Sequence, residues 1–168
     1  KPISIDTYKA KVAEKAIDAG ASIINDISGL MMDKTMAKVA AEANVPVILM
    51  HKKGTPRMMQ KYPIRKNLLS EIMSYWRKSV SIAIDAGIKE DKIILDPGIG
   101  FGKTLQHNLE ILKRLRELKS MGFPILIGTS RKKYIGTILK LSVQESLYGT
   151  LATLAIAVMN GANIVRVH

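Results

Sequence analysis

One unit recurs along the chain: a short apolar run that ends in polar residues, followed by a stretch with apolar residues at helical spacing. Strands that alternate with helices predict a parallel sheet joined by helical crossovers. The apolar runs lack regular polar alternation, which is typical of strands buried on both faces. We predict six strands, at residues 3–6, 22–26, 45–51, 92–97, 123–130 and 163–168.

The stretches between these strands predict helices, at residues 7–20, 33–44, 68–87, 108–122 and 144–162. Three of them end at a glycine, the residue suited to a left-handed helix C-cap: Gly20, Gly87 and Gly122. Neither a composition break nor a low-complexity tract interrupts the pattern, so we expect residues 1–168 to belong to a single domain.

A doubly wound open sheet and a (β/α)₈ barrel both fit this pattern. Polar residues stand at the C-terminal ends of the predicted strands, and a barrel gathers these ends into one ring where catalytic groups converge. We therefore predict an α/β fold of the (β/α)₈ TIM-barrel type. A barrel has eight strands over about 250 residues, so we expect this chain to supply about six β/α units, the third to the eighth strand. The functional protein is expected to add strands before Lys1 and a helix after His168.

The composition of the chain limits the kinds of molecule that it is expected to bind. The 168 residues carry 26 Lys and Arg against 14 Asp and Glu, a net charge of +12, which attracts anions. Aromatic residues make up only 5% and the lysines are scattered, so we expect small anionic substrates and no nucleic acid. No long apolar run is free of charge, and we expect no membrane partner. Zero cysteines exclude disulfides and thiolate metal sites and fit a cytoplasmic protein.

The stretch ILDPGIGFGKT, residues 94–104, superficially resembles a phosphate-binding loop. A P-loop needs a glycine five positions before the glycine of Gly-Lys-Thr, and that position holds Pro97, which has no N–H to donate to phosphate. The dinucleotide motif fails as well, because Lys103 stands where its third glycine belongs. Asp96 and the glycines therefore require another explanation.

Each polar residue at a strand end also has a structural interpretation. Asp6 suits the N-cap of the next helix, Asn25–Asp26 suit Asx turns, and His51 is more often structural than catalytic. Ser130–Lys132 fit a solvated helix start, and Arg166 fits a structural ion pair. Their convergence at one barrel mouth nevertheless exceeds what folding requires and favours a binding site.

These strand-end motifs resemble those of dihydropteroate synthase in order and spacing: ISIDT, NDISG, LMHKKGTP, DPGIGFGKT, IGTSRKKYIG and RVH. The resemblance spans the whole chain, and GTSRK together with RVH makes it specific. Pterin-binding methyltetrahydrofolate methyltransferase domains share the barrel and the strand-end Asp and Asn, and they are the alternative. A degenerate barrel or scaffold without activity is a third possibility. Lys52–Lys53 depart from the Met-Gln often found in the family.

The resemblance implies a transferase of folate biosynthesis and a target of sulfonamides. Such an enzyme joins p-aminobenzoate to 7,8-dihydropterin-CH₂ pyrophosphate and releases pyrophosphate. The resemblance also implies a homodimer and Mg²⁺ as cofactor, held with an asparagine of a strand that precedes this sequence, so we expect no metal ligand within it. Without that strand, residues 1–168 alone are expected to be inactive.

The resemblance assigns roles to particular residues. An aspartate can accept two hydrogen bonds from the adjacent N–H and NH₂ of a pterin, and Asp96 is the expected acceptor. The other expected pterin residues are Asp6, Asn25, Met50, Lys132 and Arg166. The expected p-aminobenzoate side consists of Phe101, Ser130 and Lys132. The pyrophosphate is assigned to Arg166 and His168, and the catalytic residues are Asp6, Lys132, Arg166 and His168. Lys103 is expected to have no catalytic role.

Overall fold

A computed structural model describes residues 1–53 and 67–168 of the chain. The chain divides into two compact units: unit 1 comprises Lys1–His51 and Ile72–Asp96, and unit 2 comprises Lys52–Glu71 and Pro97–His168. A single domain stays a prediction. The end of the LMHKKGTP motif, Gly54, Thr55 and Pro56, lies outside the described residues.

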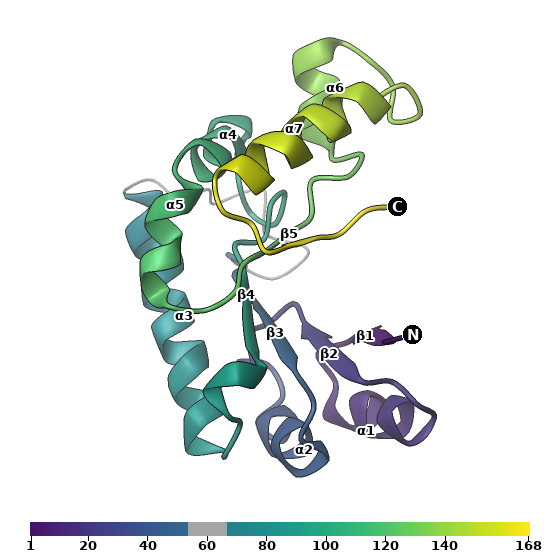
Figure 1. Ribbon diagram of the computed structural model, residues 1–168, viewed down its shortest axis with the longest axis vertical. Coiled ribbons are helices and arrows are strands. Elements are labelled where there is room, and N and C mark those ends of the chain that lie inside the picture. Colours follow the sequence, from purple (N-terminus) through teal and green to yellow (C-terminus); the bar gives the residue numbers. More distant parts are fainter. Residues whose placement is uncertain (54–66) are drawn as a thin grey trace. The chain divides into compact units, whose positions relative to one another are not determined.

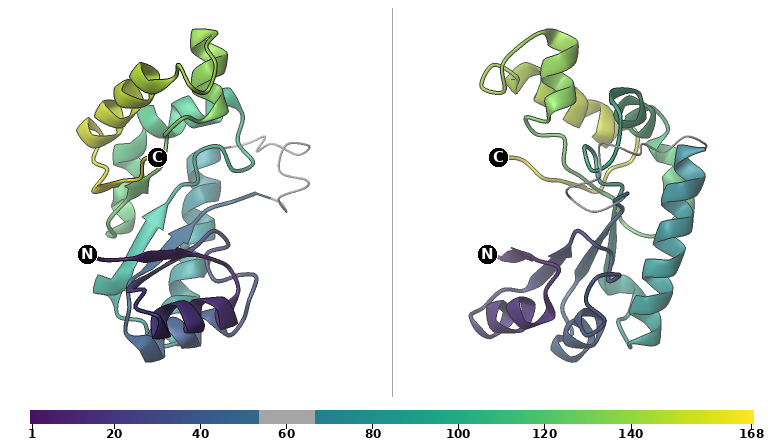
Figure 2. Two further views of the ribbon diagram at one scale, coloured as in Figure 1. Left: turned by 90° about the vertical axis from the view of Figure 1, so that its right-hand side faces the viewer. Right: turned by 180° about the vertical axis from the view of Figure 1, so that it is seen from behind.

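Unit 1 contains a parallel sheet of four strands in sequential order, shown in Figure 1: β1 (Ser4–Asp6), β2 (Ile23–Asp26), β3 (Val47–Met50) and β4 (Ile93–Asp96). The connections contain α1 (Ala10–Asp18), α2 (Met36–Ala43), α3 (Leu68–Asp85) and the short 3₁₀ helix η1 (Glu90–Lys92). Right-handed crossovers between successive neighbours place these helices on the same side of the sheet (Figure 2).

The register of the strands defines two faces. Ile24 pairs with Val47, and Leu49 pairs with Leu95, and all four side chains are fully buried. This face packs against the helices, where Trp76 of α3 is also fully buried. The opposite face carries the alternate residues, because successive side chains of a strand point to opposite sides.

Unit 2 contains mainly helices: α4 (Leu105–Lys113), α5 (Leu115–Leu118), the 3₁₀ helix η2 (Lys119–Met121), α6 (Lys133–Leu139) and α7 (Leu147–Met159). Its two strands, β5 (Leu126–Ile127) and β6 (Ile164–Val165), form a parallel pair. Leu115, Leu118 and Ile125 are fully buried and form part of its core.

All six predicted strands are present, each shorter than predicted, and Gly20, Gly87 and Gly122 have the positive φ expected at helix ends. The prediction of one helix over residues 108–122 is wrong. The chain leaves helical geometry at Arg114 (φ −106°, ψ 19°), which separates α4 from α5. The Arg114 guanidinium spans this break, with hydrogen bonds of 2.6 Å to Glu110 and 2.7 Å to Glu117.

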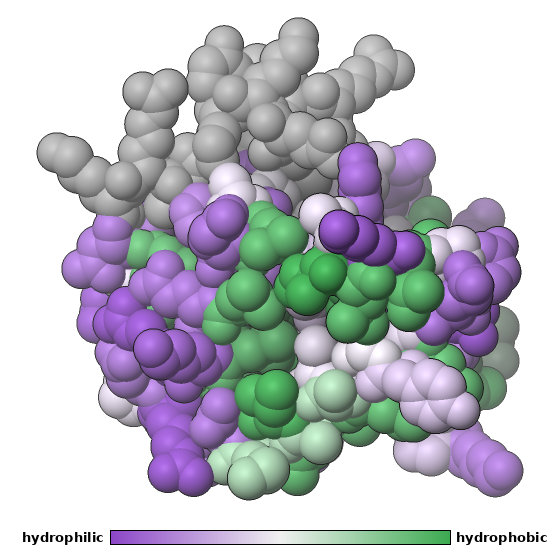
Figure 3. All heavy atoms as spheres, turned by 90° about the horizontal axis from the view of Figure 1, so that it is seen from above, coloured by the Kyte–Doolittle hydropathy of each residue, from purple (hydrophilic) through white to green (hydrophobic). Residues whose placement is uncertain are grey.

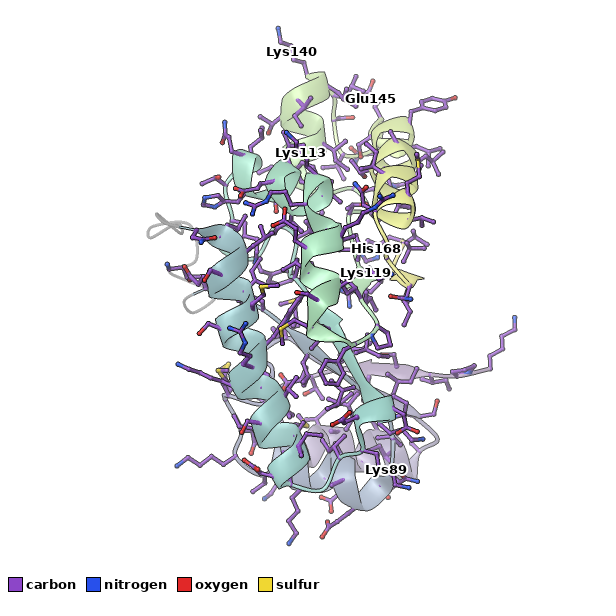
Figure 4. The ribbon with its side chains drawn as sticks, turned by 60° about the vertical axis from the view of Figure 1, so that its left-hand side comes forward. Lys89, Lys113, Lys119, Lys140, Glu145 and His168 are labelled. Carbon is purple, nitrogen blue, oxygen red and sulfur yellow. The ribbon has the colours of Figure 1, made fainter. Side chains whose placement is uncertain are left out.

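Helices α6 and α7 expose many apolar side chains, and Figure 3 shows apolar groups gathered among polar ones in the view from above. Within the described ranges, no helix combines the length and the apolar character needed to cross a membrane. Lys140, at the end of α6, extends away from the ribbon (Figure 4), as expected of a solvated lysine.

Candidate active site

The carboxyl end of the sheet in unit 1 carries a polar face formed by Asp6, Asn25 and Asp96, with the apolar Met50 on the same face. Asp6 pairs with Asn25, and Met50 pairs with Asp96. Asn25 pairs with Ile48, which lies two residues before Met50 and therefore on the same face. Met50, Asp96 and Asn25 are at most 2% exposed, whereas Asp6 is exposed. Unit 1 thus places four residues predicted to bind pterin on one face.

Asn25 and Asp26 have different roles. The Asp26 carboxylate accepts hydrogen bonds from the Ser28 N–H and hydroxyl, both at 2.7 Å, and from the Leu30 N–H at 2.9 Å. The Asx-turn interpretation is therefore correct for Asp26. Neither Oδ1 nor Nδ2 of Asn25 has a hydrogen-bond partner among residues 1–53 and 67–168, although both atoms are buried. Burying an unpaired amide is costly, and this pattern suits a ligand-binding group.

The N-cap interpretation of Asp6 is wrong. Helix α1 begins at Ala10, and Lys9 occupies its N-cap position without a capping side chain. The carboxylate of Asp33 instead accepts a 2.8 Å hydrogen bond from the Ala10 N–H. This bond, together with bonds from Thr35, lowers the pKa of Asp33. The helix start is thus stabilised by a residue 23 positions away, and sequence spacing alone does not reveal it.

His51 is a buried residue at the end of β3, 1% exposed. Its N–H donates to the carbonyl of Asp96 at 2.8 Å. Its ring meets Tyr75 edge-on, with the ring centroids 4.9 Å apart. The Tyr75 hydroxyl donates to the Ser28 carbonyl at 2.6 Å. Burial, with a smaller contribution from the charge of Asp26, raises the pKa of Tyr75 to about 12. These contacts favour the structural interpretation of His51.

The glycine-rich loop in unit 2 is held by its own neighbours. The Gly100 N–H donates to Asn108 Oδ1 at 2.8 Å, and the Phe101 N–H donates to the Gly98 carbonyl at 3.0 Å. Lys103 Nζ donates to the Phe101 carbonyl at 3.1 Å. Thr104 is the N-cap of α4 and forms a capping box with His107. Lys103 and Thr104 thus make structural contacts here, and the likeness to a P-loop is incidental.

Lys132 and Phe101 are brought together in unit 2. Lys132 Nζ lies 4.6 Å from the centroid of the Phe101 ring, a cation–π contact. Lys132 is half-buried and lines a cavity of about 380 Å³. The other lining residues come from the glycine-rich loop and the starts of α4 and α6: Gly100, Gly102, Lys103, Thr104, Leu105, Asn108, Lys133, Tyr134 and Thr137.

The ends of β5 and β6 bring Ser130, Arg166 and His168 near one another. The His168 N–H donates to Ser130 Oγ at 3.2 Å, and the Arg166 N–H donates to the Ile127 carbonyl at 2.9 Å. A guanidinium nitrogen of Arg166 lies 3.3 Å from the position that a Cβ at Gly128 would occupy. The absence of a side chain at Gly128 therefore lets the guanidinium lie close to the backbone.

In the described ranges, no three His, Cys, Asp or Glu residues are grouped in a way that could hold a metal ion.

A family model described as a pterin binding enzyme matches residues 1–168 of the chain. The chain belongs to the pterin-binding enzyme family.

Curated relatives of this family member include dihydropteroate synthases. That of Clostridium beijerinckii is 53% identical over 168 residues, and that of Bacillus subtilis is 49% identical over 167 residues. Each alignment covers 99% of this chain, which spans 60% and 56% of the length of these two relatives.

The chain is also similar in fold to solved structures of dihydropteroate synthases. A Yersinia pestis dihydropteroate synthase with a sulfonamide drug matches with a TM-score of 0.96 and 40% identity. A Clostridium difficile dihydropteroate synthase in the presence of pteroic acid matches with a TM-score of 0.93 and 44% identity. Each match covers 99% of this chain and 61% of the solved one. The prediction of an α/β barrel fold, with parallel strands alternating with helices, is confirmed.

Within this pterin-binding family member, sequence reasoning missed two side chains that organise the surroundings of the predicted residues, the half-buried Tyr75 and the buried Asn108. Tyr75 joins α3 to the loop after β2, and Asn108 joins α4 to the glycine-rich loop. Tyr75 lies in a helical pattern that offers no sign of its contact. Asn108 stands at the start of a predicted helix, shortly after the glycine-rich stretch. An asparagine at such a position often bonds to nearby backbone groups, and this is the one sequence signal of its contact.

Proposed function

We propose that the full-length protein is a dihydropteroate synthase, which joins p-aminobenzoate to 7,8-dihydropterin-CH₂ pyrophosphate and releases pyrophosphate. The observation that carries this proposal is the polar face of unit 1, with a buried Asn25 side chain that lacks a partner among the described residues. Similarity to dihydropteroate synthases over 99% of the chain supports it.

On this proposal, Asp96 accepts hydrogen bonds from two adjacent donors on the pterin edge. Asn25 offers a donor and an acceptor to the same ring, which suits its unpartnered Oδ1 and Nδ2. Met50 contributes an apolar surface to the pocket. Lys132 donates to the pterin carbonyl or a ring nitrogen, and Arg166 stacks flat on the ring, as guanidinium groups do on aromatic systems.

The reaction requires charge stabilisation at two places. As pyrophosphate leaves, positive charge develops on the pterin methylene, and the Asp6 carboxylate stabilises it. Negative charge develops on the departing pyrophosphate, and the cationic side chain of Arg166, together with His168, stabilises it. The amine of p-aminobenzoate then forms the new C–N bond to the methylene carbon and loses a proton.

We assign the p-aminobenzoate side to Phe101, Ser130 and Lys132. The ring of Phe101 offers an aromatic surface, and the ammonium of Lys132 lies 4.6 Å from the ring centroid, at the boundary with the pterin. The Ser130 hydroxyl also accepts the His168 N–H, so it links this side to the end of β6.

The family resemblance implies Mg²⁺, which when bound would neutralise pyrophosphate charge. The described side chains form no metal site of their own, so we assign none of them to the ion. We also propose that the full-length protein is a homodimer.

The test is product formation by the full-length protein. We expect it to produce dihydropteroate and pyrophosphate in equal amounts from the two substrates, and pyrophosphate to strengthen the binding of p-aminobenzoate. A protein that binds methyltetrahydrofolate without any effect of pyrophosphate, and forms no dihydropteroate, would instead be a methyltransferase domain.

A further inference from the structure

Asn108 lies at the base of the glycine-rich loop, in the first turn of α4, and is 3% exposed. We propose that Asn108 is a positioning residue that holds the p-aminobenzoate side of the site in its binding geometry. This proposal rests on the function proposed above.

The two ends of the Asn108 amide join two segments of unit 2. Oδ1 accepts the 2.8 Å hydrogen bond from the Gly100 N–H, in the middle of the loop. Nδ2 donates a 2.8 Å hydrogen bond to the carbonyl of Thr104, the N-cap of α4. A side chain at this position therefore needs both an acceptor and a donor; aspartate lacks the donor, and leucine and alanine lack both. The loop is thereby fixed to the start of the helix.

The position of Gly100 in turn determines what Lys132 contacts. A Cβ at Gly100, where φ is 84°, would lie 3.4 Å from Lys132 Cδ, so the stem of the lysine runs close beside the loop. The next residue is Phe101, whose ring centroid lies 4.6 Å from Lys132 Nζ. Gly100, Asn108 and Lys132 line the same cavity of about 380 Å³. A shift of the loop would therefore displace both Phe101 and Lys132.

A residue that only stabilises the fold would behave differently, and Asn160 is a matched control. Its Nδ2 donates a 2.8 Å hydrogen bond to the Leu112 carbonyl, so it too fixes α4 through its backbone. Asn160 is half-buried and is not among the residues that line the cavity. Asn108→Ala and Asn160→Ala each remove an amide that bonds to α4, but only Asn108→Ala releases Gly100.

The first experiment measures steady-state kinetics of the full-length protein. In Asn108→Ala, we expect the KM for p-aminobenzoate to rise about threefold to tenfold, the effect of one lost hydrogen bond. The KM for the pterin pyrophosphate should change less than about twofold. Asn160→Ala should leave both KM values unchanged, although both variants lower Tm. Equal p-aminobenzoate KM values in the two variants would overturn the proposal.

A second measurement is independent of activity. Phe101 and Phe123 are the two phenylalanines of the sequence, and fluorinated phenylalanine gives each a ¹⁹F NMR signal, assigned by Phe→Leu variants. The Phe101 signal should shift or broaden in Asn108→Ala, whereas the Phe123 signal should not, and Asn160→Ala should change neither. Should Asn108→Ala not fold, Asn108→Asp keeps the acceptor for Gly100 but loses the donor to Thr104, and it should shift the Phe101 signal from its wild-type position. An unshifted Phe101 signal in that variant would overturn the proposal.

The two proposals fail in distinguishable ways. A displaced Phe101 signal in a protein that forms no dihydropteroate would contradict the proposed function and leave the positioning role intact. An active enzyme in which the Phe101 signal and the p-aminobenzoate KM of Asn108→Ala match the wild type would overturn the positioning role alone.

Discussion

Asn25 and Asp26 are neighbours in β2, and their side chains lie on opposite faces of the sheet. The Asp26 carboxylate accepts three hydrogen bonds from the loop that follows, whereas neither polar atom of the Asn25 side chain has a partner in the described parts of the chain. The Asp26 side chain therefore stabilises the fold, and we propose that the Asn25 side chain binds the ligand.

This contrast predicts that substitutions at Asp26 and Asn25 differ in their effect on the stability of the fold. Asp26→Asn replaces an accepting oxygen with a donor that faces an N–H, so the free energy of unfolding should fall by about 1–3 kcal/mol. Asn25→Ala breaks no side-chain hydrogen bond to the residues that the structure describes and should change that free energy by less than about 1 kcal/mol. Urea unfolding of both variants measures the difference, and equal losses of stability would contradict the assignment.

The two lysines near the glycine-rich loop should differ in catalysis. Lys132→Ala removes a proposed substrate donor and should cost about 2–4 kcal/mol of transition-state stabilisation. Lys103→Ala removes a hydrogen bond to the Phe101 carbonyl and should cost about 1 kcal/mol. The comparison of kcat/KM for the two variants is the test, and equal losses would refute the roles given to them.

The raised pKa of Tyr75 predicts that the stability of the fold depends on pH in the alkaline range. Its pKa is raised from an ordinary value of 10.0 to about 12 by burial, with a contribution from the charge of Asp26. Between pH 10 and 12 the unfolded tyrosine loses its proton while the folded one keeps it, so the stability that Tyr75 contributes falls as pH rises. Below pH 10 that contribution is fully present.

Tyr75→Phe provides the measurement. The variant lacks the hydrogen bond to the Ser28 carbonyl and should be less stable than the wild type at pH 8. The difference in unfolding free energy between the two proteins should shrink as pH rises from 10 to 12, because only the wild type loses the contribution of Tyr75. A difference that stays constant up to pH 12 would show that the hydroxyl is not shielded.

A substitution at Gly102 tests how closely the glycine-rich loop packs on the segment after β3. A Cβ at this position, where φ is 68°, would lie 2.7 Å from the carbonyl oxygen of Lys53. Gly122 has a similar φ of 83°, and among the described residues no atom other than those of its chain neighbours lies within 4 Å of such a Cβ. Gly122→Ala should cost about 1–2 kcal/mol for its backbone conformation. Gly102→Ala should cost a further 1–3 kcal/mol, roughly the penalty for overpacking. Equal Tm values would contradict this close contact.

The sequence predicted the strands and their polar ends because parallel strands joined by helices leave a clear apolar pattern. Asp6, Asn25, Met50 and Asp96 could therefore be assigned to strand ends, and the register confirms that they share a face. The division of roles between Asn25 and Asp26 was not predictable, because it depends on which side chain meets the loop. The cap that Asp33 provides to α1 was missed for the same reason.

The contacts of unit 2 were harder to predict. The bond from Gly100 to Asn108 connects residues eight positions apart, across a loop in which Gly98, Gly100 and Gly102 all have positive φ values. The break at Arg114 was also invisible, because Arg114 is a good helix former whose side chain binds glutamates on both sides of the break.

Asp96 is the residue on which the proposed pterin recognition depends most directly. It is 1% exposed at the end of β4, on the same face as Asn25. Asp96→Asn replaces an accepting oxygen with an NH₂ that would face a donor of the ligand. Losing a hydrogen bond to a charged group costs about 1.5–3 kcal/mol, and an unsatisfied buried donor adds about 1–3 kcal/mol.

The decisive measurement is calorimetric titration of a pterin ligand into the full-length protein and its Asp96→Asn and Asp26→Asn variants. We predict that Asp96→Asn weakens pterin binding at least about tenfold and lowers the Tm of the ligand-free protein less than Asp26→Asn does. Asp26→Asn, which alters the opposite face, should keep pterin affinity close to that of the wild type. Unchanged pterin affinity in Asp96→Asn, together with a marked loss of Tm, would contradict the account.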